Sequence, residues 1–343
     1  MLCESVISRQ SLAAGFCKGL AKESERLAGP SMHFPRYMAR HIAVSAAFVL
    51  AYLALNQPAI ILLARIGFVA WYPATGLVIA MMLGLSPGYA LVVAISNVLA
   101  SELIYHQPLL SFTNSLGVAG NVLCYGGAAY LLRNALRIDL GLRHRRDVVH
   151  YVWISTVAAA GNTVFGVSCL LADHSIQWHD RMPSAIGWFL GDMIGLIGVA
   201  PFLLVHVLPG VRQWISPLLH ARVVRKTTSS GGFLLEICGQ VLATLFVLWV
   251  MFGTADGRYD HFYLGFIPVL WTAMRQGVRR AVTALLALNF GIIVAMQLFP
   301  PTTAQYNKVA LFMLIQSAAG LSSAPKSVNG TVSPSISAKK PAI

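Results

Sequence analysis

The sequence has few charged residues for its length. Only 11% of its 343 residues are Asp, Glu, Lys or Arg, whereas 57% are hydrophobic; a soluble domain carries roughly 25% charged residues. The mean hydropathy is +0.68. A water-soluble core cannot bury this much apolar surface, so the solvent must be lipid. The composition excludes an ordinary soluble domain and predicts an all-α, polytopic bundle of transmembrane helices.

The sequence also lacks the spacings of common catalytic and metal-binding motifs. It contains no phosphate-cradling glycine loop with lysine, no His-Glu-x-x-His and no Cys-x-x-Cys. Its five cysteines have no disulfide or metal spacing and are interpreted as apolar filler. The loops 173–182 and 255–261 hold acids and histidines, but without fixed ligand spacing they favour solvated loops. We therefore predict no enzyme, no cofactor and no metal.

The two ends of the chain lack long apolar runs. Residues 1–39 do not have the pattern of a secretory signal peptide; we interpret them as a basic cytoplasmic leader, and a start at Met32 or Met38 would leave most of it untranslated. The tail 323–343 is rich in Ser, Pro and Lys without periodicity, which predicts disorder. The predicted integral membrane domain is 40–322.

Apolar runs of about 17–25 residues within this domain predict about eight to ten spans. The two shortest are the eighth and the tenth. The predicted ranges are 41–57, 68–85, 89–106, 110–132, 148–172, 184–207, 233–252, 261–275, 280–299 and 308–322.

The net charge of +13 comes from basic residues that recur between the apolar runs. They do not form one patch, so we predict no nucleic-acid partner. If the N-terminus is cytoplasmic, 21 of the 25 Lys and Arg residues fall in inside segments and four fall outside. This split follows the positive-inside rule. It predicts a multi-pass plasma-membrane protein with both termini in the cytoplasm and the lipid bilayer as its partner.

Several polar side chains fall near the middle of the predicted spans. Counting 1.5 Å per residue, Asp192 lies about 12 Å from the outer end of the sixth span. Asn162 lies about 21 Å from the inner end of the fifth. Asn97, Asn121 and Asn289 are also deep within their spans. For each asparagine, the simplest interpretation is an interhelical hydrogen bond.

Asp192 differs from the asparagines because it can carry a charge. An ionised carboxylate at this depth costs at least ~2.5–3.5 kcal/mol, and no Lys or Arg is predicted at the same depth. One interpretation is a buried polar clasp between helices. The other is a site, formed with Asn121, Asn162 and Asn97, that binds a small polar or cationic ligand or a proton. Close helix packing is indicated by glycines at four-residue spacing, which are Gly187, Gly191 and Gly195.

Four stretches resemble the elements of one family. Trp71-Tyr-Pro73-Ala-Thr-Gly76 is similar to its W-P-P-x-G element, with Tyr72 in place of a proline. Gly120-Asn121 resembles its G-N element. The stretch from Gly187 to Gly195, followed by Pro201, is similar to its W-x-G-D-x-x-G-x-x-x-x-x-P signature. The closing P-x-x-W-x-x-x-R-x-G element corresponds to Pro268, Trp271, Arg275 and Gly277.

These elements, in this order over roughly 40–320, resemble the first type of bacterial membrane-associated sensor domain. The resemblance implies a signal-input domain of the bacterial inner membrane that precedes a histidine kinase, a diguanylate cyclase or a phosphodiesterase. The chain ends about twenty residues after the last predicted span without such an output domain. That departure indicates an interrupted sensor, or one that acts on a separate signalling or transporter-like membrane partner; a homodimer stays open.

A second interpretation is a small-solute transporter. Pro201 and Pro268 lie within predicted spans, and we expect both to kink their helices. A bundle with prolines inside its spans and an acid near the midplane suits transport as well as sensing. Transporters commonly contain internal repeats, and the sequence shows no convincing pair of matching halves. The sensor is therefore the favoured prediction, and the stimulus is not readable from the residues.

Overall fold

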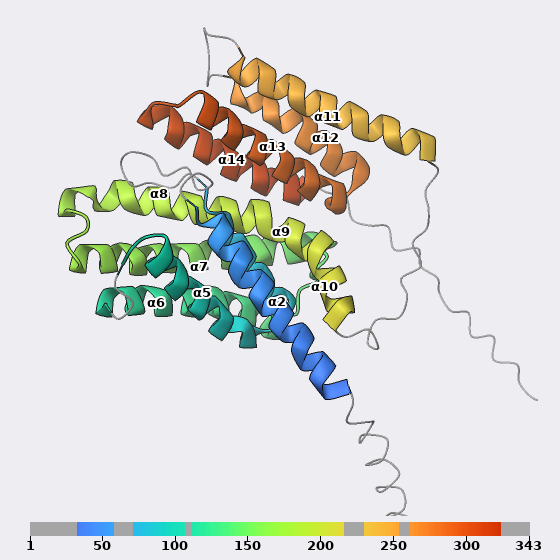
Figure 1. The fold of residues 1–343 in the computed structure, drawn as a ribbon. Coiled ribbons are helices and arrows are strands. Elements are labelled where there is room, and N and C mark those ends of the chain that lie inside the picture. The colour runs from blue at the N-terminus through green and yellow to red at the C-terminus, as the bar shows by residue number, and fades with distance from the viewer. Residues whose placement is uncertain (1–32, 58–70, 108–110, 216–229, 254–260, 324–343) are drawn as a thin grey trace, which may run out of the picture.

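The computed structural model describes residues 33–57, 71–107, 111–215, 230–253 and 261–323, and within them it confirms the all-α prediction. Each predicted span corresponds to helical structure (Figure 1). The helices are α2 (His33–Leu55), α4 (Pro73–Gly84), α5 (Ala90–Leu103), α6 (Phe112–Tyr130), α7 (Arg145–Ala172), α8 (Arg181–Ile194), α9 (Ala200–Phe202), α10 (Leu208–Ile215), α11 (Ser230–Phe252), α12 (Phe266–Gln276), α13 (Val278–Leu298) and α14 (Thr303–Ser323).

Two boundaries bear on the predicted domains. Helix α2 begins at His33, which lies inside the range predicted as the leader. The remainder of that leader, residues 1–32, lies outside the described residues, as do the predicted tail from 324 onward and most of the loop 255–261.

Among the described residues, five helical segments are long and apolar enough to cross a membrane. They are Tyr37–Leu55, Phe112–Ala135, Arg145–Ala172, Trp178–Ile215 and Val278–Leu298. Pro73–Gly84, Pro87–Leu103 and Ile237–Phe252 are shorter apolar helices. Helix α12 has 11 residues and measures about 17 Å, which is too short to cross a ~30 Å hydrocarbon layer alone.

The helices form two groups that lie side by side (Figure 1). Helix α2 and the helices from α4 to α10 form the amino-terminal bundle, and α11–α14 form the carboxy-terminal bundle. The groups meet where α14 packs on α8 and where α13 packs on the π-helical turn η4 (Gly195–Val199). Both groups therefore contact the segment that carries Asp192.

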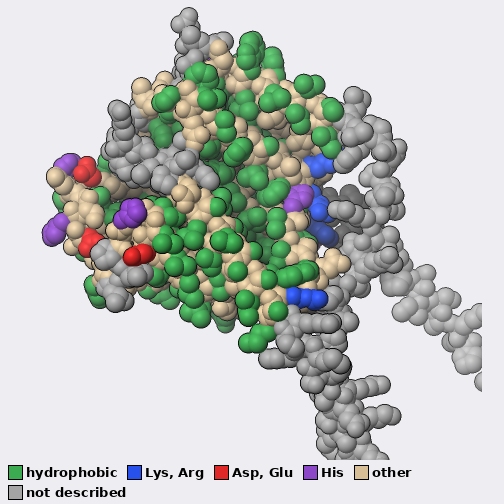
Figure 2. Space-filling model, in the orientation of Figure 1, with side chains coloured by type: hydrophobic (Ala, Val, Ile, Leu, Met, Phe, Trp, Pro, Cys, Tyr) green, Lys and Arg blue, Asp and Glu red, His purple; other side chains and the backbone are tan. Residues whose placement is uncertain are grey.

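Charged side chains gather at the two ends of the helices on one face of the molecule. On the face drawn in Figure 2, Lys and Arg lie at the right-hand end, Asp and Glu lie at the left-hand end with most of the histidines, and hydrophobic side chains cover the area between. We call these the basic end and the acidic end. The first residues of α2 and α7 and the last of α10 lie at the basic end (Figure 1).

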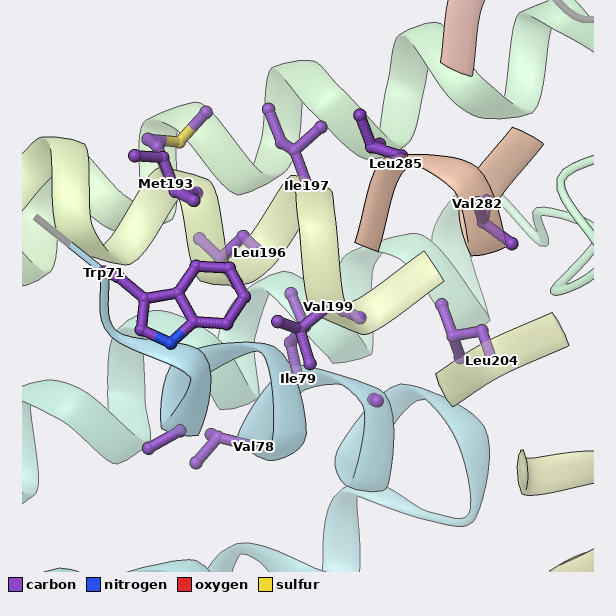
Figure 3. Close-up of a cluster of buried hydrophobic side chains, with 14 of the residues drawn as sticks. Trp71, Val78, Ile79, Met193, Leu196, Ile197, Val199, Leu204, Val282 and Leu285 are labelled. Atoms are coloured by element: carbon purple, nitrogen blue, oxygen red, sulfur yellow. The ribbon is translucent and has the colours of Figure 1, made fainter. Parts of the chain in front are cut away.

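Helix α4 lies at the centre of the amino-terminal bundle. All of its residues except Leu77 are buried. Figure 3 shows Leu196 and Val199 between their own helix and α4, whereas Ile197 projects from the opposite side, toward Leu285 of α13. A helix that is apolar all round can be stable only when it is buried on every side, which explains why this short helix is interior.

Candidate functional site

The site is built on the crossing of α4 with α8 and η4, where two glycines remove the side chains that would keep the helices apart. A Cβ atom added at Gly76 would lie 2.3 Å from the backbone oxygen of Gly195. One added at Gly195 would lie 2.2 Å from the backbone oxygen of Tyr72. The family element that contains Gly76 therefore packs against the one that contains Gly195. Each element supplies a glycine that lets the two backbones touch.

Asp192 lies one turn before Gly195 and is almost completely buried, at 1% exposure. Its Oδ2 atom accepts a hydrogen bond of 2.5 Å from the Tyr125 hydroxyl of α6. The same atom accepts one of 2.9 Å from the Asn162 side-chain amide of α7, and that amide also lies 3.3 Å from the Tyr125 hydroxyl. Three helices thus converge on one carboxyl oxygen.

The other carboxyl oxygen of Asp192 is different. Oδ1 is buried and has no hydrogen-bond partner among the described residues, although the indole of Trp188, one turn earlier, is near enough to interact with the carboxyl group. The two ion pairs found in the described residues do not include Asp192. Its charge is therefore not neutralised by an arginine or lysine of these residues, and Oδ1 is the carboxyl oxygen without a hydrogen-bond donor among them.

The first turn of α4 lies directly against this part of α8. The backbone amide of Tyr72 donates to the Gly191 oxygen at 3.2 Å, and the Thr75 hydroxyl lies 3.3 Å from the Asp192 backbone oxygen. The amino-terminal end of a helix carries a partial positive charge. Placing that end beside a buried acid is electrostatically favourable.

A second polar cluster lies toward the acidic end of α2, α4 and α5. The hydroxyls of Tyr72 and Tyr105 donate to the Asn56 side-chain oxygen at 2.5 and 3.2 Å. The Tyr52 hydroxyl donates to Asn97 at 2.8 Å and lies 3.5 Å from the Tyr72 hydroxyl. The Tyr72 backbone amide donates to the Gly191 oxygen, so this cluster borders the segment that carries Asp192.

The structure separates the four predicted site residues. Asn162 contacts Asp192 directly. Asn121 is one turn before Tyr125 on α6, and its Oδ1 is buried with no hydrogen-bond partner among the described residues. Asn97 belongs to the tyrosine cluster. Tyr125 was not among the predicted site residues, although its position four residues after Asn121 places it on the same helix face.

The segment that carries Asp192 is a long helix with two irregular turns. Between α8 and α10, two π-helical stretches, Gly195–Val199 and Leu203–Val207, flank the short α9 with Pro201. Proline lacks an amide hydrogen and disrupts regular helical bonding, and π-helical turns occur frequently at functional sites. The predicted disturbance at Pro201 is therefore present as a change of helix type.

The fourth family element, P-x-x-W-x-x-x-R-x-G, lies in the carboxy-terminal bundle, away from Asp192. Pro268, Trp271 and Arg275 are all on α12, which packs on α11, α13 and α14 in the carboxy-terminal bundle. Pro268 is in the first turn of α12, where a proline removes no helical hydrogen bond, so it does not have the kinking role predicted for it. Gly277 has φ of 79°, which lets the chain turn sharply from α12 into α13.

Two arginines hold the opposite end of α4. Arg133, from the π-helical turn η2 (Leu131–Ala135), donates to the backbone oxygens of Leu83 and Leu85, at 3.3 and 2.5 Å. Arg212 of α10 donates to the Gly84 oxygen through Nε, at 2.5 Å, and through a terminal nitrogen. Cations at a helix carboxyl end satisfy its free carbonyls and its dipole. Both residues lie outside the spans predicted from the sequence, which end at 132 and 207.

The chain is thus an integral membrane protein with a buried acid at the meeting point of its central helices. A family model, MASE1, matches residues 41–325. The chain therefore belongs to the MASE1 family, whose members are membrane-associated sensory domains. Among curated proteins and among solved structures, no match was found.

Proposed function

We propose that the chain is the input module of a bacterial signalling protein and that it receives its signal at Asp192. The output would be a histidine kinase, a diguanylate cyclase or a phosphodiesterase, in the same polypeptide or as a separate partner. The family assignment supports the sensory role. The proposed site depends on the hydrogen bonding of the Asp192 carboxyl group. One of its oxygens accepts hydrogen bonds from Tyr125 and Asn162, and the other has no partner in the described residues.

The proposed orientation has both termini in the cytoplasm and the basic end facing it. The separation of charges in Figure 2 supports this orientation, because Lys and Arg are retained on the cytoplasmic side during insertion. A reporter enzyme fused after Lys340 should be active only in its cytoplasmic form. One inserted beside His174 should be active only in its external form. Activity of both fusions on the same side would exclude the orientation.

Asp192 can receive a signal in two chemically related ways. A proton can bind at Oδ1, or a small polar or cationic ligand can donate a hydrogen bond to it. Either event changes the charge or the bonding of a group that contacts α6 and α7 through its side chain and α4 through its backbone. A buried charge without a countercharge is costly in a membrane, so occupation of Oδ1 would shift the relative stability of helix arrangements.

The test joins the full chain to a diguanylate cyclase and measures cyclic dinucleotide formation while the external pH and small-solute composition are varied. The Asp192→Asn variant keeps the size of the side chain and removes its charge. It should reach the membrane in normal amount and lose its response. The matched control is Tyr151→Phe, which alters another buried polar group that bonds to the Leu196 backbone; it should keep its response. A normally responsive Asp192→Asn fusion would leave Asp192 as a structural clasp.

The same proposal assigns no catalysis to this chain. Purified protein without a fused output should neither autophosphorylate nor make or cleave cyclic dinucleotides. Such activity in a sample free of contaminating kinase and cyclase would overturn this part of the proposal.

A small-solute transporter is the second candidate, favoured by the irregular helix from α8 to α10 beside a deep acid. Proteoliposomes separate the two functions. A transporter would move a solute, or protons together with a solute, across the vesicle membrane and would lose that flux in the Asp192→Asn variant. The sensor proposal expects no Asp192-dependent flux under conditions that change the output of the fusion.

A further inference from the structure

Helices α7 and α8 pack against each other, and two turns of α8 face two turns of α7. In the first pair, the Asn162 amide bonds to the Asp192 carboxyl group at 2.9 Å. In the second, Trp188, one turn earlier on α8, lies against Gly166, one turn later on α7. A Cβ atom added at Gly166 would lie 2.6, 2.7 and 3.0 Å from three carbons of the benzene part of the indole. The indole therefore packs directly on the backbone of α7, one turn from the buried acid.

This position of the indole depends on Gly166. Glycine inside a helix is destabilising relative to alanine, and Gly166 lies in the interior of α7. Here the missing side chain leaves the space that the Trp188 ring occupies, because even one methyl group would overlap three of the ring carbons. The atoms that would have to move belong to a side chain, so the indole can be displaced while both helix backbones stay in place.

Trp188 covers Asp192 on one side. Helix α8 begins at Arg181, at the acidic end (Figure 1), and Trp188 lies between that start and Asp192. The residues one turn before Trp188 on the same helix face are small, Ser184 and Ala185. Trp188 is partly buried, whereas Asp192 is 1% exposed. Along this face of α8, the indole is therefore the largest side chain between the acid and the acidic end.

We propose that the Trp188 indole is a gate that controls access to Asp192 from the acidic end. In contact with Gly166, it separates that end from the Oδ1 atom, which is buried without a hydrogen-bond partner in the described residues. When the indole turns away from Gly166, a proton or a small cationic ligand reaches Oδ1. Side-chain rotation is fast compared with the movement of whole helices. What arrives at Oδ1 rests on the proposed function, whereas the gate concerns access alone.

The experiment measures access to position 192 with a thiol reagent, in full-length Asp192→Cys protein. A membrane-impermeant methanethiosulfonate with a trimethylammonium group is added to right-side-out or to inverted vesicles. Mass spectrometry locates the modified cysteine, and the rate at position 192 is compared with and without Trp188→Ala. If the open arrangement is a minor state, populated at roughly 0.1–10%, Trp188→Ala should speed the modification by about tenfold or more. The increase should occur from the side that the acidic end faces.

Three further variants make the test specific to the indole. Gly166→Ala displaces the ring without removing it and should also speed the modification; it decides the test if Trp188→Ala reaches the membrane in reduced amount. Trp188→Phe keeps a ring on Gly166 and should react nearly as slowly as Asp192→Cys alone. Gly127→Ala is the matched control for an added methyl group, because a Cβ there would meet nothing within 4 Å, and it should leave the rate unchanged.

Equal rates with and without the Trp188 indole would overturn the gate. An increase that is the same from both sides of the membrane, or the same in Gly127→Ala, would mean general loosening and would overturn it too. These measurements involve no signalling output, so the two proposals fail separately. A normally responsive Asp192→Asn fusion would reject Asp192 as the receiving group, whereas unchanged modification rates would reject Trp188 as its gate.

Discussion

The two bundles bury polar side chains in different ways. In the amino-terminal bundle, the polar groups surround a carboxyl group, and Tyr125 and Asn162 both bond to it. In the carboxy-terminal bundle, the corresponding groups are neutral. Asn289, Gln316 and Ser317 are fully buried, and the Asn289 side-chain amide donates a hydrogen bond to the Ser317 hydroxyl at 3.1 Å.

The comparison shows what a buried charge requires that a neutral amide does not. Both side-chain polar atoms of Gln316 have no hydrogen-bond partner among the described residues, and neither has the Oδ1 atom of Asn289. Amides at such positions are tolerated because they lose less solvation than a charge does. Asp192 needs donors from two other helices and the start of a third beside it. We therefore expect changes near Asp192 to alter response, and changes in the carboxy-terminal bundle to alter stability alone.

The largest effect is expected at the helix crossing that supports Asp192. Gly195→Ala places a methyl group 2.2 Å from the Tyr72 backbone oxygen and 2.6 Å from the Thr75 hydroxyl. Because a backbone atom cannot move aside, this overpacking should lower the free energy of unfolding by about 3 kcal/mol, measured by thermal unfolding in detergent. Gly117→Ala on α6, where a Cβ would meet nothing within 4 Å, is the control and should be unchanged. Similar stabilities for the two variants would contradict the close approach.

The next effect concerns the bonds to Asp192. Tyr125→Phe removes the 2.5 Å hydrogen bond and leaves the acid with fewer donors, so it should cost about 1–3 kcal/mol and change the signalling response. Tyr151→Phe removes a hydrogen bond of 2.6 Å to a backbone oxygen in the same bundle. It should cost about 1 kcal/mol with a normal response. If Tyr125→Phe changes stability without changing the signalling response, the expectation that changes near Asp192 alter the response is wrong.

A smaller effect is expected at the basic end of α4. Arg133→Gln and Arg212→Gln each remove a charge that faces the carbonyls of Leu83, Gly84 and Leu85. Each should cost about 0.5–2 kcal/mol and should loosen α4, which hydrogen exchange of its last amides would detect. Arg143→Gln, which breaks an exposed ion pair, should cost less than about 1 kcal/mol. Unchanged exchange in both capping variants would show that the arginines do not hold α4.

The smallest effect is expected in the carboxy-terminal bundle. Gln316→Met has similar shape and removes two buried atoms that have no partner in the described residues. Its free energy of unfolding should stay the same or rise by about 1 kcal/mol, whereas Asn162→Leu, which removes a donor to Asp192, should lower it. Strong destabilisation by Gln316→Met would mean that Gln316 binds something essential, and the contrast between the bundles would then be wrong.

Much of the architecture could be predicted from the sequence, because hydropathy and helix length are local properties. The all-α membrane fold and the helical ranges followed from apolar runs. The importance of Gly76 and Gly195 followed from motif positions, but their contact with each other did not. The depth of Asp192 and Asn162 could be counted along each helix, and their proximity could not, since it depends on which face each helix turns toward its neighbours.

The sequence by itself determined that this chain is a helical membrane protein with a basic and an acidic end, and that an acid lies deep inside it. Hydrophobicity and charge placement decide these properties residue by residue. Only the tertiary structure decided that Tyr125 and Asn162 bond to Asp192, that α4 is a short central helix whose first turn touches the acid, and that Arg133 and Arg212 cap its other end. These contacts join residues far apart in the chain, and they exist only because the rotation and crossing of packed helices bring those particular faces together.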